Sequence, residues 1–167
     1  DCTLTDIDVQ RIYGAQQAYI KASTIIIDDQ SSLGIDQIKA RAIRWKRTAG
    51  IQVIFIDYIQ LVTSKKNTEA RHLEVADISR KCKEIAKELD VPVIALAQLN
   101  RESEGATSKI PVISNLRESG GLEADADEIL LLHRPDMYDT HDKPGLMDVI
   151  IGKNRFGPTG KFSLFFN

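Results

Sequence analysis

The sequence predicts an α/β fold, in which helices flank a mostly parallel sheet and a β-hairpin closes the C-terminal end. Two observations predict this class. Short runs of β-branched residues alternate with amphipathic helical segments, and two apolar runs in the middle of the chain each end in one polar residue. The length of 167 residues is that of one ordinary domain, so we expect a single unit.

Helical spacing dominates the first part of the chain. A capping-box pattern opens a helix that we expect over residues 6–21, and a β-branched run at residues 24–27 indicates a short strand. A second helix is expected over residues 35–50, because apolar positions recur on one face and a glycine follows them. Lys and Arg occupy its other face, which we interpret as a solvated surface.

The middle of the chain contains two strands with polar ends. Residues 51–56 are mostly apolar, as expected for a strand covered on both faces, and Asp57 follows them directly. Apolar residues three or four positions apart predict a helix over residues 70–89. The next strand is expected over residues 91–97, and Gln98 follows it.

Strands and turns are predicted for the last third of the chain. Residues 101–113 have little periodicity, which is typical of a loop. Strands are expected at residues 129–133 and 147–153. A Gly- and Pro-containing turn at residues 156–160 indicates that the second of these strands pairs with residues 161–166 as a hairpin.

Composition and charge narrow the classes of function. The 22 Lys and Arg against 24 Asp and Glu give a net charge of -2, so any contact with nucleic acid must be local. Two cysteines suggest no disulfide framework, and we expect a reducing, cytoplasmic environment. No apolar run approaches the roughly 18 residues of a membrane span, so the sequence predicts no membrane partner.

Asp57 and Gln98 are candidate site residues, because ligands of parallel sheets bind beyond the carboxyl ends of the strands. An Asp after an apolar strand has the form of an acid that holds Mg²⁺ beside nucleotide phosphates. Gln98 is suited to hydrogen-bonding a γ-phosphate or its attacking water. The alternatives are an ordinary strand-end Asp and a solvated loop Gln.

Cations and glycines near the C-terminus form a second candidate group. Lys153 and Arg155 lie two residues apart at a strand end, so they would project the same way and meet one phosphate together. The alternative is a solvated hairpin tip. Residues 116–121 are expected in a loop, where two glycines would let backbone N–H groups approach an anion closely, with Arg117 beside them. The alternative there is a helix cap.

Taken together, these motifs resemble the DnaB-type replicative DNA helicases, in their C-terminal RecA-like ATPase domain. The resemblance covers essentially all 167 residues, and several motifs in the family's order are more specific than any one of them. The landmarks are DYIQL at 57–61, ISR at 78–80, AKEL at 86–89 with VPVIAL at 91–96, QLNR at 98–101, LRESG at 116–120, DAD at 125–127 and KNRFGPTG at 153–160.

The resemblance implies a RecA-like P-loop NTPase core that uses ATP and Mg²⁺. Asp57 would be the Walker B acid and metal ligand, and Gln98 the γ-phosphate sensor. Lys153 and Arg155 would reach the nucleotide of a neighbouring subunit, Arg155 as the arginine finger. The implied assembly is a homohexamer.

The resemblance also implies contacts with single-stranded DNA. Arg117, Glu118 and Gly120 match the family loop that lines the central channel, and Lys65 and Lys66 correspond to a second channel loop of more variable sequence. Primase and a helicase loader are the implied protein partners.

One family motif is absent from the sequence, which contains no G-x-x-x-x-G-K-[ST]. In the family this phosphate-binding loop precedes the stretch that resembles residue 1, so we expect the chain to be the rear portion of one domain, its N-terminal part missing. We expect residues 1–167 alone to be inactive. A RecA-like recombinase or other ATPase, and a non-catalytic module for DNA binding or oligomerisation, are the alternative functions.

Overall fold

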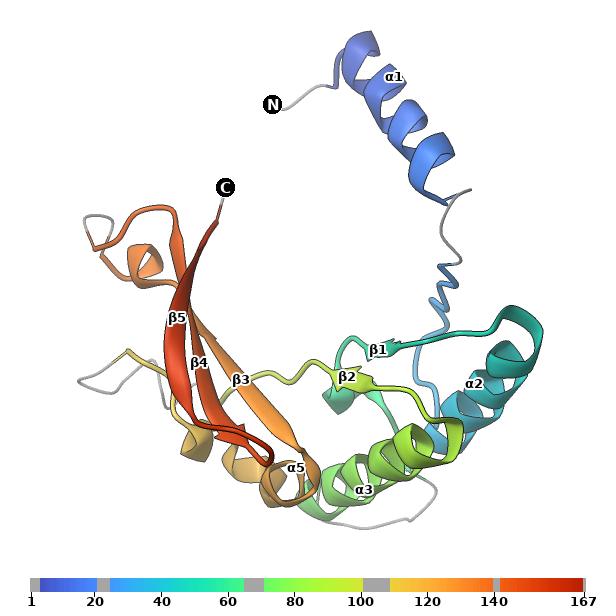
Figure 1. Cartoon of the computed structure of the whole chain (residues 1–167), viewed down its shortest axis with the longest axis vertical. Helices are drawn as coiled ribbons and strands as arrows, with labels where there is room; N and C mark the ends of the chain where they lie inside the picture. The colour runs from blue at the N-terminus through green and yellow to red at the C-terminus, as the bar shows by residue number, and fades with distance from the viewer. Residues whose placement is uncertain (1–3, 21–24, 65–70, 101–108, 140–141, 167) are drawn as a thin grey trace.

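The computed structural model describes residues 4–20, 25–64, 71–100, 109–139 and 142–166. They form two small sheets and a set of helices (Figure 1). In chain order the elements are α1 (Asp6–Ala15), the π-helix η1 (Gln16–Ile20), α2 (Ile35–Ala49), β1 (Ile54–Ile56), η2 (Ile59–Leu61), α3 (Arg71–Leu89), β2 (Val93–Ala95), η3 (Ile113–Ser119), α5 (Gly120–Asp125), β3 (Glu128–His133), η4 (Pro135–Met137), β4 (Leu146–Asn154) and β5 (Gly160–Phe165).

The strands β1 and β2 pair in parallel, which confirms both predicted strands although each is shorter than expected. Ile54 is opposite Val93, and Ile56 is opposite Ala95. The pairing extends past β2, because the Leu96 N–H donates to the Ile56 carbonyl oxygen at 2.9 Å. Parallel pairing brings the carboxyl ends of both strands to the same edge.

Helices α2 and α3 pack on the parallel pair and supply most of the core, as the periodicity predicted. Gly50 ends α2 in the left-handed conformation, with φ of 64°, which glycine adopts without steric cost. Cys82 is 8% exposed, and burial raises the pKa of its thiol to about 11. The buried cluster consists of Ile35, Ala42, Ile56, Ile59, Val62, Ile78, Cys82 and Ile85.

The strands β3, β4 and β5 form an antiparallel sheet, and the predicted C-terminal hairpin is its β4–β5 half. Ile151 is opposite Gly160, so the turn between them lies where the sequence indicated. The described strands therefore divide between one parallel pair and one antiparallel sheet.

Asp148 of β4 has a buried carboxylate that binds side chains of β5. Asp148 is 1% exposed, and its Oδ2 lies 2.6 Å from Lys161 Nζ and 3.3 Å from Lys143 Nζ. Its Oδ1 accepts from the Ser163 hydroxyl at 2.6 Å. Lys161 first, then Ser163 and Lys143, hold the pKa of this carboxyl far below its ordinary value against the opposing effect of desolvation.

The predicted strand at residues 24–27 is wrong over its described part, residues 25–27. Ile25 and Ile27 are 62% and 81% exposed and belong to no strand. A β-branched run becomes a strand only where a neighbouring edge accepts its hydrogen bonds, and no described strand pairs with this run.

The first helix stands away from the rest of the described chain (Figure 1). Its capping box is present, with the Asp8 N–H donating to Thr5 Oγ1 at 3.3 Å and the Thr5 N–H donating to Asp8 Oδ2 at 3.0 Å. No residue of α1 is buried. None of the helices in the described ranges has the length and hydrophobicity of a membrane span.

Residues 116–121 lie within the helical stretch of η3 and α5, with a kink at Leu116, which corrects the predicted loop. η3 runs into α5 at Gly120, and the Asn115 side chain accepts from the Val112 N–H at 2.7 Å at the start of η3. A Cβ on Gly121 would lie 2.6 Å from Cα of Ala76 in α3. The glycine at 121 therefore allows α5 to pack closely against α3, an effect of tertiary contact that the sequence does not reveal.

Candidate functional site

Asp57 and Gln98 lie at the carboxyl edge of the parallel pair, as predicted. Asp57 follows β1 directly, and Gln98 follows the end of β2 after two residues. Both side chains are exposed. The structure therefore brings these two strand-end residues to one edge, although their catalytic roles remain predictions.

The Asp57 carboxylate is exposed and unpaired within the described part of the chain. It makes no hydrogen bond or ion pair with any residue that the structure describes. Mg²⁺ keeps several waters and takes only one or two carboxylates, so an exposed, unpaired Asp fits it. Across the described ranges, no group of three or more His, Cys, Asp or Glu is placed to hold a metal ion. Bound Mg²⁺ would therefore depend on phosphate oxygens as well.

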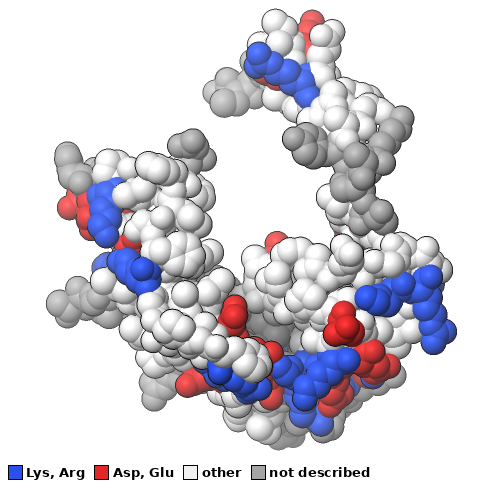
Figure 2. All heavy atoms as spheres, in the orientation of Figure 1, with Lys and Arg blue, Asp and Glu red and all other residues white. Residues whose placement is uncertain are grey.

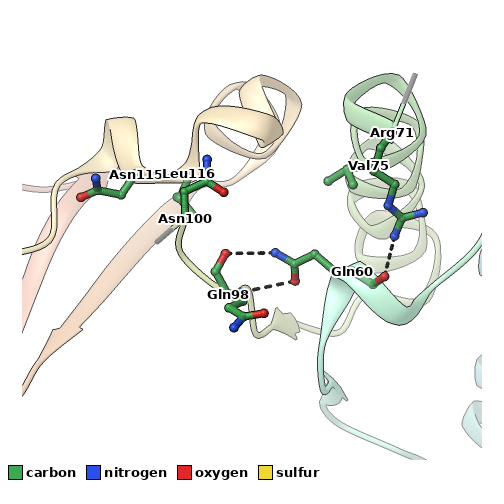
Figure 3. A pocket seen from close by; sticks show the side chains of 7 residues that line it. All are labelled: Gln60, Arg71, Val75, Gln98, Asn100, Asn115 and Leu116. Carbon is green, nitrogen blue, oxygen red and sulfur yellow. Dashed lines mark hydrogen bonds between the residues drawn. The ribbon is translucent and has the colours of Figure 1, made fainter. Parts of the chain in front are cut away.

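The Gln60 side chain binds the backbone of Gln98 (Figure 3). Gln60 Nε2 donates to the Gln98 carbonyl oxygen at 3.1 Å, and Oε1 accepts from the Gln98 N–H at 3.3 Å. A side-chain amide offers both a donor nitrogen and an acceptor oxygen, so it satisfies the backbone as a neighbouring strand would. The Gln98 side chain points away from Gln60 (Figure 3) and makes no hydrogen bond with a described residue. Gln60 thus fixes the Gln98 backbone and leaves its side chain available.

A polar pocket of about 220 Å³ lies beside this contact (Figure 3). The Asn100 N–H donates to the Asn115 carbonyl oxygen at 3.1 Å and joins the segment after Gln98 to η3. Arg71 donates to the Gln60 carbonyl oxygen from the start of α3. The pocket is lined by Gln60, Arg71, Val75, Gln98, Asn100, Asn115 and Leu116.

Lys153 and Arg155 both reach the C-terminal end of α5. Lys153 Nζ donates to the Glu123 carbonyl oxygen at 2.5 Å and to the Ala124 carbonyl oxygen at 3.4 Å. Arg155 Nη2 donates to the same Ala124 oxygen at 3.3 Å. The two cations thus project to the same side and share one acceptor, the arrangement expected from their spacing.

Asp127 is the acidic residue that contacts Arg155 of this pair. Its buried Oδ1 lies 2.9 Å from Arg155 Nη1, an ion pair without a directed hydrogen bond, because no described donor meets hydrogen-bond geometry at Oδ1. The Asp127 carbonyl oxygen accepts from the Arg155 N–H at 2.8 Å. The hydrogen bond from Lys83 is the main cause that lowers the pKa of the Asp127 carboxyl; desolvation opposes it, and the charges of Arg155 and Lys153 assist it.

The predicted DNA-contact residues are only partly described. Arg117 and Glu118 belong to η3, but their side chains lie outside the described part of the structure. Gly120 is exposed at the start of α5, with open space where a Cβ would stand. Lys65 and Lys66 lie outside the described residues. The DNA-contact assignment therefore stays a prediction.

Opposite charges are interleaved over α3 and α5 on the face drawn in Figure 2. The ion pairs of the described chain include Lys39 with Glu88 at 2.5 Å and Lys81 with Asp36 at 2.8 Å. Paired charges of this kind do not form a continuous basic patch, so this face offers no broad attraction to a polyanion. Cation contacts to DNA would have to be local, as the net charge predicted.

Sequence reasoning assigned no role to Gln60 or Asp127, although both lie in the motifs that carry the family resemblance. Gln60 contacts a backbone 38 positions away, and Asp127 binds cations from α3 and from the end of β4. Their positions within DYIQL and DAD were the available signals, but no spacing shows which distant group each side chain reaches.

Comparisons with known proteins identify the family. The chain matches the family described as DnaB-like helicase C terminal domain over residues 1–167. It is 44% identical over 157 residues to "Replicative DNA helicase DnaB" of Mycobacterium leprae, covering 93% of this chain and 26% of that protein. Identity to the protein of the same name from Buchnera aphidicola subsp. Schizaphis graminum is 45% over 166 residues, covering 98% and 36%. The chain thus spans between about a quarter and about a third of the length of these relatives.

Solved structures agree with this assignment. One, an ATPase domain, has a TM-score of 0.90 and 39% identity, covering 99% of this chain and 58% of that chain. A second, which presents a DnaB-like replicative helicase and its interactions with primase, has a TM-score of 0.89 and 39% identity, covering 99% and 40%. The sequence match and the fold together show that this chain belongs to the DnaB-like helicase C-terminal domain family.

Proposed function

We propose that this chain is part of an ATP-driven replicative DNA helicase, a homohexamer that moves along single-stranded DNA and unwinds duplex. One observation carries the proposal. Asp57 and Gln98 lie at the carboxyl edge of the parallel pair, whereas the side chains of Lys153 and Arg155 bind the C-terminal end of α5. No hydrogen bond or ion pair in the described part of the chain joins the two groups. Such a division suits a nucleotide site completed by a neighbouring subunit.

Each group has a role in this proposal that follows from its chemistry. Asp57 would hold Mg²⁺, which neutralises phosphate charge when bound. Gln98 would hydrogen-bond the γ-phosphate or orient water without itself titrating. Lys153 and Arg155 would meet the phosphates of the neighbouring subunit's nucleotide, where Arg155 would stabilise charge that develops on the transferred group.

The phosphate-binding loop would come from chain that precedes residue 1 in the relatives. A groove of about 790 Å³, lined mostly by apolar residues, includes residues of β2 and of β3 among its walls. Leu130 and Leu132 on β3 are 54% and 58% exposed beside it. Exposed apolar surface of this extent is uncommon on a complete domain, and we propose that the preceding part of the domain covers it.

Single-stranded DNA would bind the segment that includes Arg117, Glu118 and Gly120, with Lys65 and Lys66 as a second contact. Six copies would then bring six sets of these cations to the DNA, which gives the local positive charge that one near-neutral chain lacks. Primase and a helicase loader complete the proposed partners. Primase interacts with the DnaB-like helicase in one of the two similar solved structures.

The test uses the complete helicase, meaning this chain together with the part that carries the phosphate-binding loop. We expect hydrolysis of ATP that single-stranded DNA stimulates, and ATP-dependent unwinding of a forked duplex. Arg155→Ala should lower turnover by about a hundredfold or more. Arg47→Ala, at an exposed cation of α2, should leave turnover unchanged.

Three results would contradict the proposal. Binding of DNA without any ATP hydrolysis would favour the non-catalytic module. Strand exchange without unwinding would favour the recombinase. Wild-type turnover in Arg155→Ala would remove the proposed finger from the mechanism.

A further inference from the structure

Three observations converge on the carboxylate of Asp127. Asp127 lies between α5 and β3, since α5 ends two residues before it and β3 begins at the next residue. Its side chain contacts Arg155, and its backbone oxygen accepts from the Arg155 N–H at 2.8 Å. Its second carboxylate oxygen is held by Lys83 of α3.

These contacts restrict Arg155 from three directions. The backbone hydrogen bond fixes the start of the side chain, and Asp127 Oδ1 lies 2.9 Å from Nη1. The Ala124 carbonyl oxygen accepts from Nη2 at 3.3 Å. The Arg155 side chain is nevertheless 44% exposed, so the guanidinium is held at the surface and not buried. A side chain held this way loses less freedom when it meets a ligand.

Lys153 is held by the same end of α5. Its Nζ donates to the Glu123 and Ala124 carbonyl oxygens, and the charge of Lys153 also acts on Asp127. Among the described residues, Asp127 is the acidic side chain that forms an ion pair with Arg155, and its charge also acts on Lys153. Without it, two like charges would share carbonyl oxygens alone, and they would repel one another.

We propose that Asp127 is a positioning residue, which holds Arg155, and through the shared end of α5 also Lys153, in the orientation that reaches the neighbouring subunit's nucleotide. This inference rests on the proposed function. Asp127 itself touches no nucleotide in this mechanism. It acts by fixing the direction of the guanidinium before the subunits meet.

The effect on turnover is tested in the complete hexameric helicase with Asp127→Asn, which keeps the shape and removes the charge. We expect kcat for ATP with single-stranded DNA to fall about tenfold at unchanged KM, because binding is retained and orientation is lost. Asp127→Glu should recover part of the loss. Asp125→Asn is the matched control, since Asp125 lies two positions earlier and makes no hydrogen bond or ion pair with either cation.

Lys83→Met separates positioning from stability, because it removes the other partner of the same carboxylate and leaves Arg155 in place. We expect its kcat to stay within about twofold of wild type. An equal loss in Lys83→Met and Asp127→Asn would assign the effect to the fold and overturn the inference. Wild-type kcat in Asp127→Asn would also overturn it.

A second readout does not need ATP turnover. Phenylglyoxal modifies guanidinium groups, and peptide mass mapping reports the rate at Arg155 in the nucleotide-free protein. Asp127→Asn should raise that rate several-fold at Arg155, with no change at the exposed Arg47. If the protein hydrolyses no ATP but this rate rises, the proposed function fails and the role of Asp127 stands. An unchanged rate at Arg155 refutes it.

Discussion

The contact between Gln60 and Gln98 leads to a sharp prediction. Gln60→Ala removes both hydrogen bonds that hold the Gln98 backbone, at 3.1 and 3.3 Å. Each such bond contributes a net of about 0.5 to 1.5 kcal/mol, and water replaces part of it at this exposed position, so we expect a loss of about 1 to 2 kcal/mol. If Gln98 must be in place in the transition state, kcat should fall about 5- to 30-fold.

The assay is steady-state ATP turnover of the complete helicase in the presence of single-stranded DNA. Gln52→Ala is the control, because Gln52 is exposed and makes no hydrogen bond with a described residue. Nucleotide affinity should change little, since the Gln60 side chain contacts only the backbone of Gln98.

Gln60→Glu tests the donor half of this contact separately. The carboxylate still accepts from the Gln98 N–H but cannot donate to the Gln98 carbonyl oxygen. Protonation would restore a donor only near the ordinary glutamate pKa of about 4.3, so turnover should stay below wild type by a constant factor from pH 8 to about 6. A wild-type kcat in either Gln60→Ala or Gln60→Glu would refute the proposed role of Gln60.

Three further predictions follow from the other sites. Asp148→Asn should lower the free energy of unfolding at pH 7; because the folded pKa of Asp148 is depressed, its stabilisation is fully present above the unfolded value of about 3.9 and is lost as the pH falls from there toward the folded pKa, so urea titrations should show the same difference at pH 7 and pH 5 and a smaller one at pH 3. A difference that stays constant with pH would contradict this. Arg117→Ala should weaken single-stranded DNA binding and reduce the salt slope by about one phosphate contact, measured by fluorescence anisotropy across a salt series; an unaltered slope removes Arg117 from the interface. Residues 1–167 alone should bind ATP only weakly, because they contain no P-loop, and micromolar affinity by calorimetric titration would refute this.

Local patterns were sufficient to predict much of the fold. The periodicity of α2 and α3 reflects their apolar faces against the parallel pair, and Gly50 marks a helix end because its backbone adopts positive φ. The turn before β5 has the composition that its geometry requires. Each of these signals is contained within a few neighbouring residues.

Features that depend on distant partners were not predicted. Residues 25–27 have strand composition but no described edge with which to pair, and residues 116–121 form helix because α5 packs against α3. The same limit applies to the site. Strand ends predicted where Asp57 and Gln98 lie, whereas the contacts of Gln60 and Asp127 exist only once remote segments are folded together.

The central claim is that each nucleotide site is shared, with Asp57 from one subunit and Arg155 from its neighbour. The most direct measurement mixes complete Asp57→Asn and Arg155→Ala subunits, each nearly inactive alone, and follows ATP turnover of the reassembled rings. A shared site predicts recovery, because about a quarter of the interfaces in a random equal mixture pair an intact Asp57 with an intact Arg155. Mixed rings that stay as inactive as either parent would contradict the shared site.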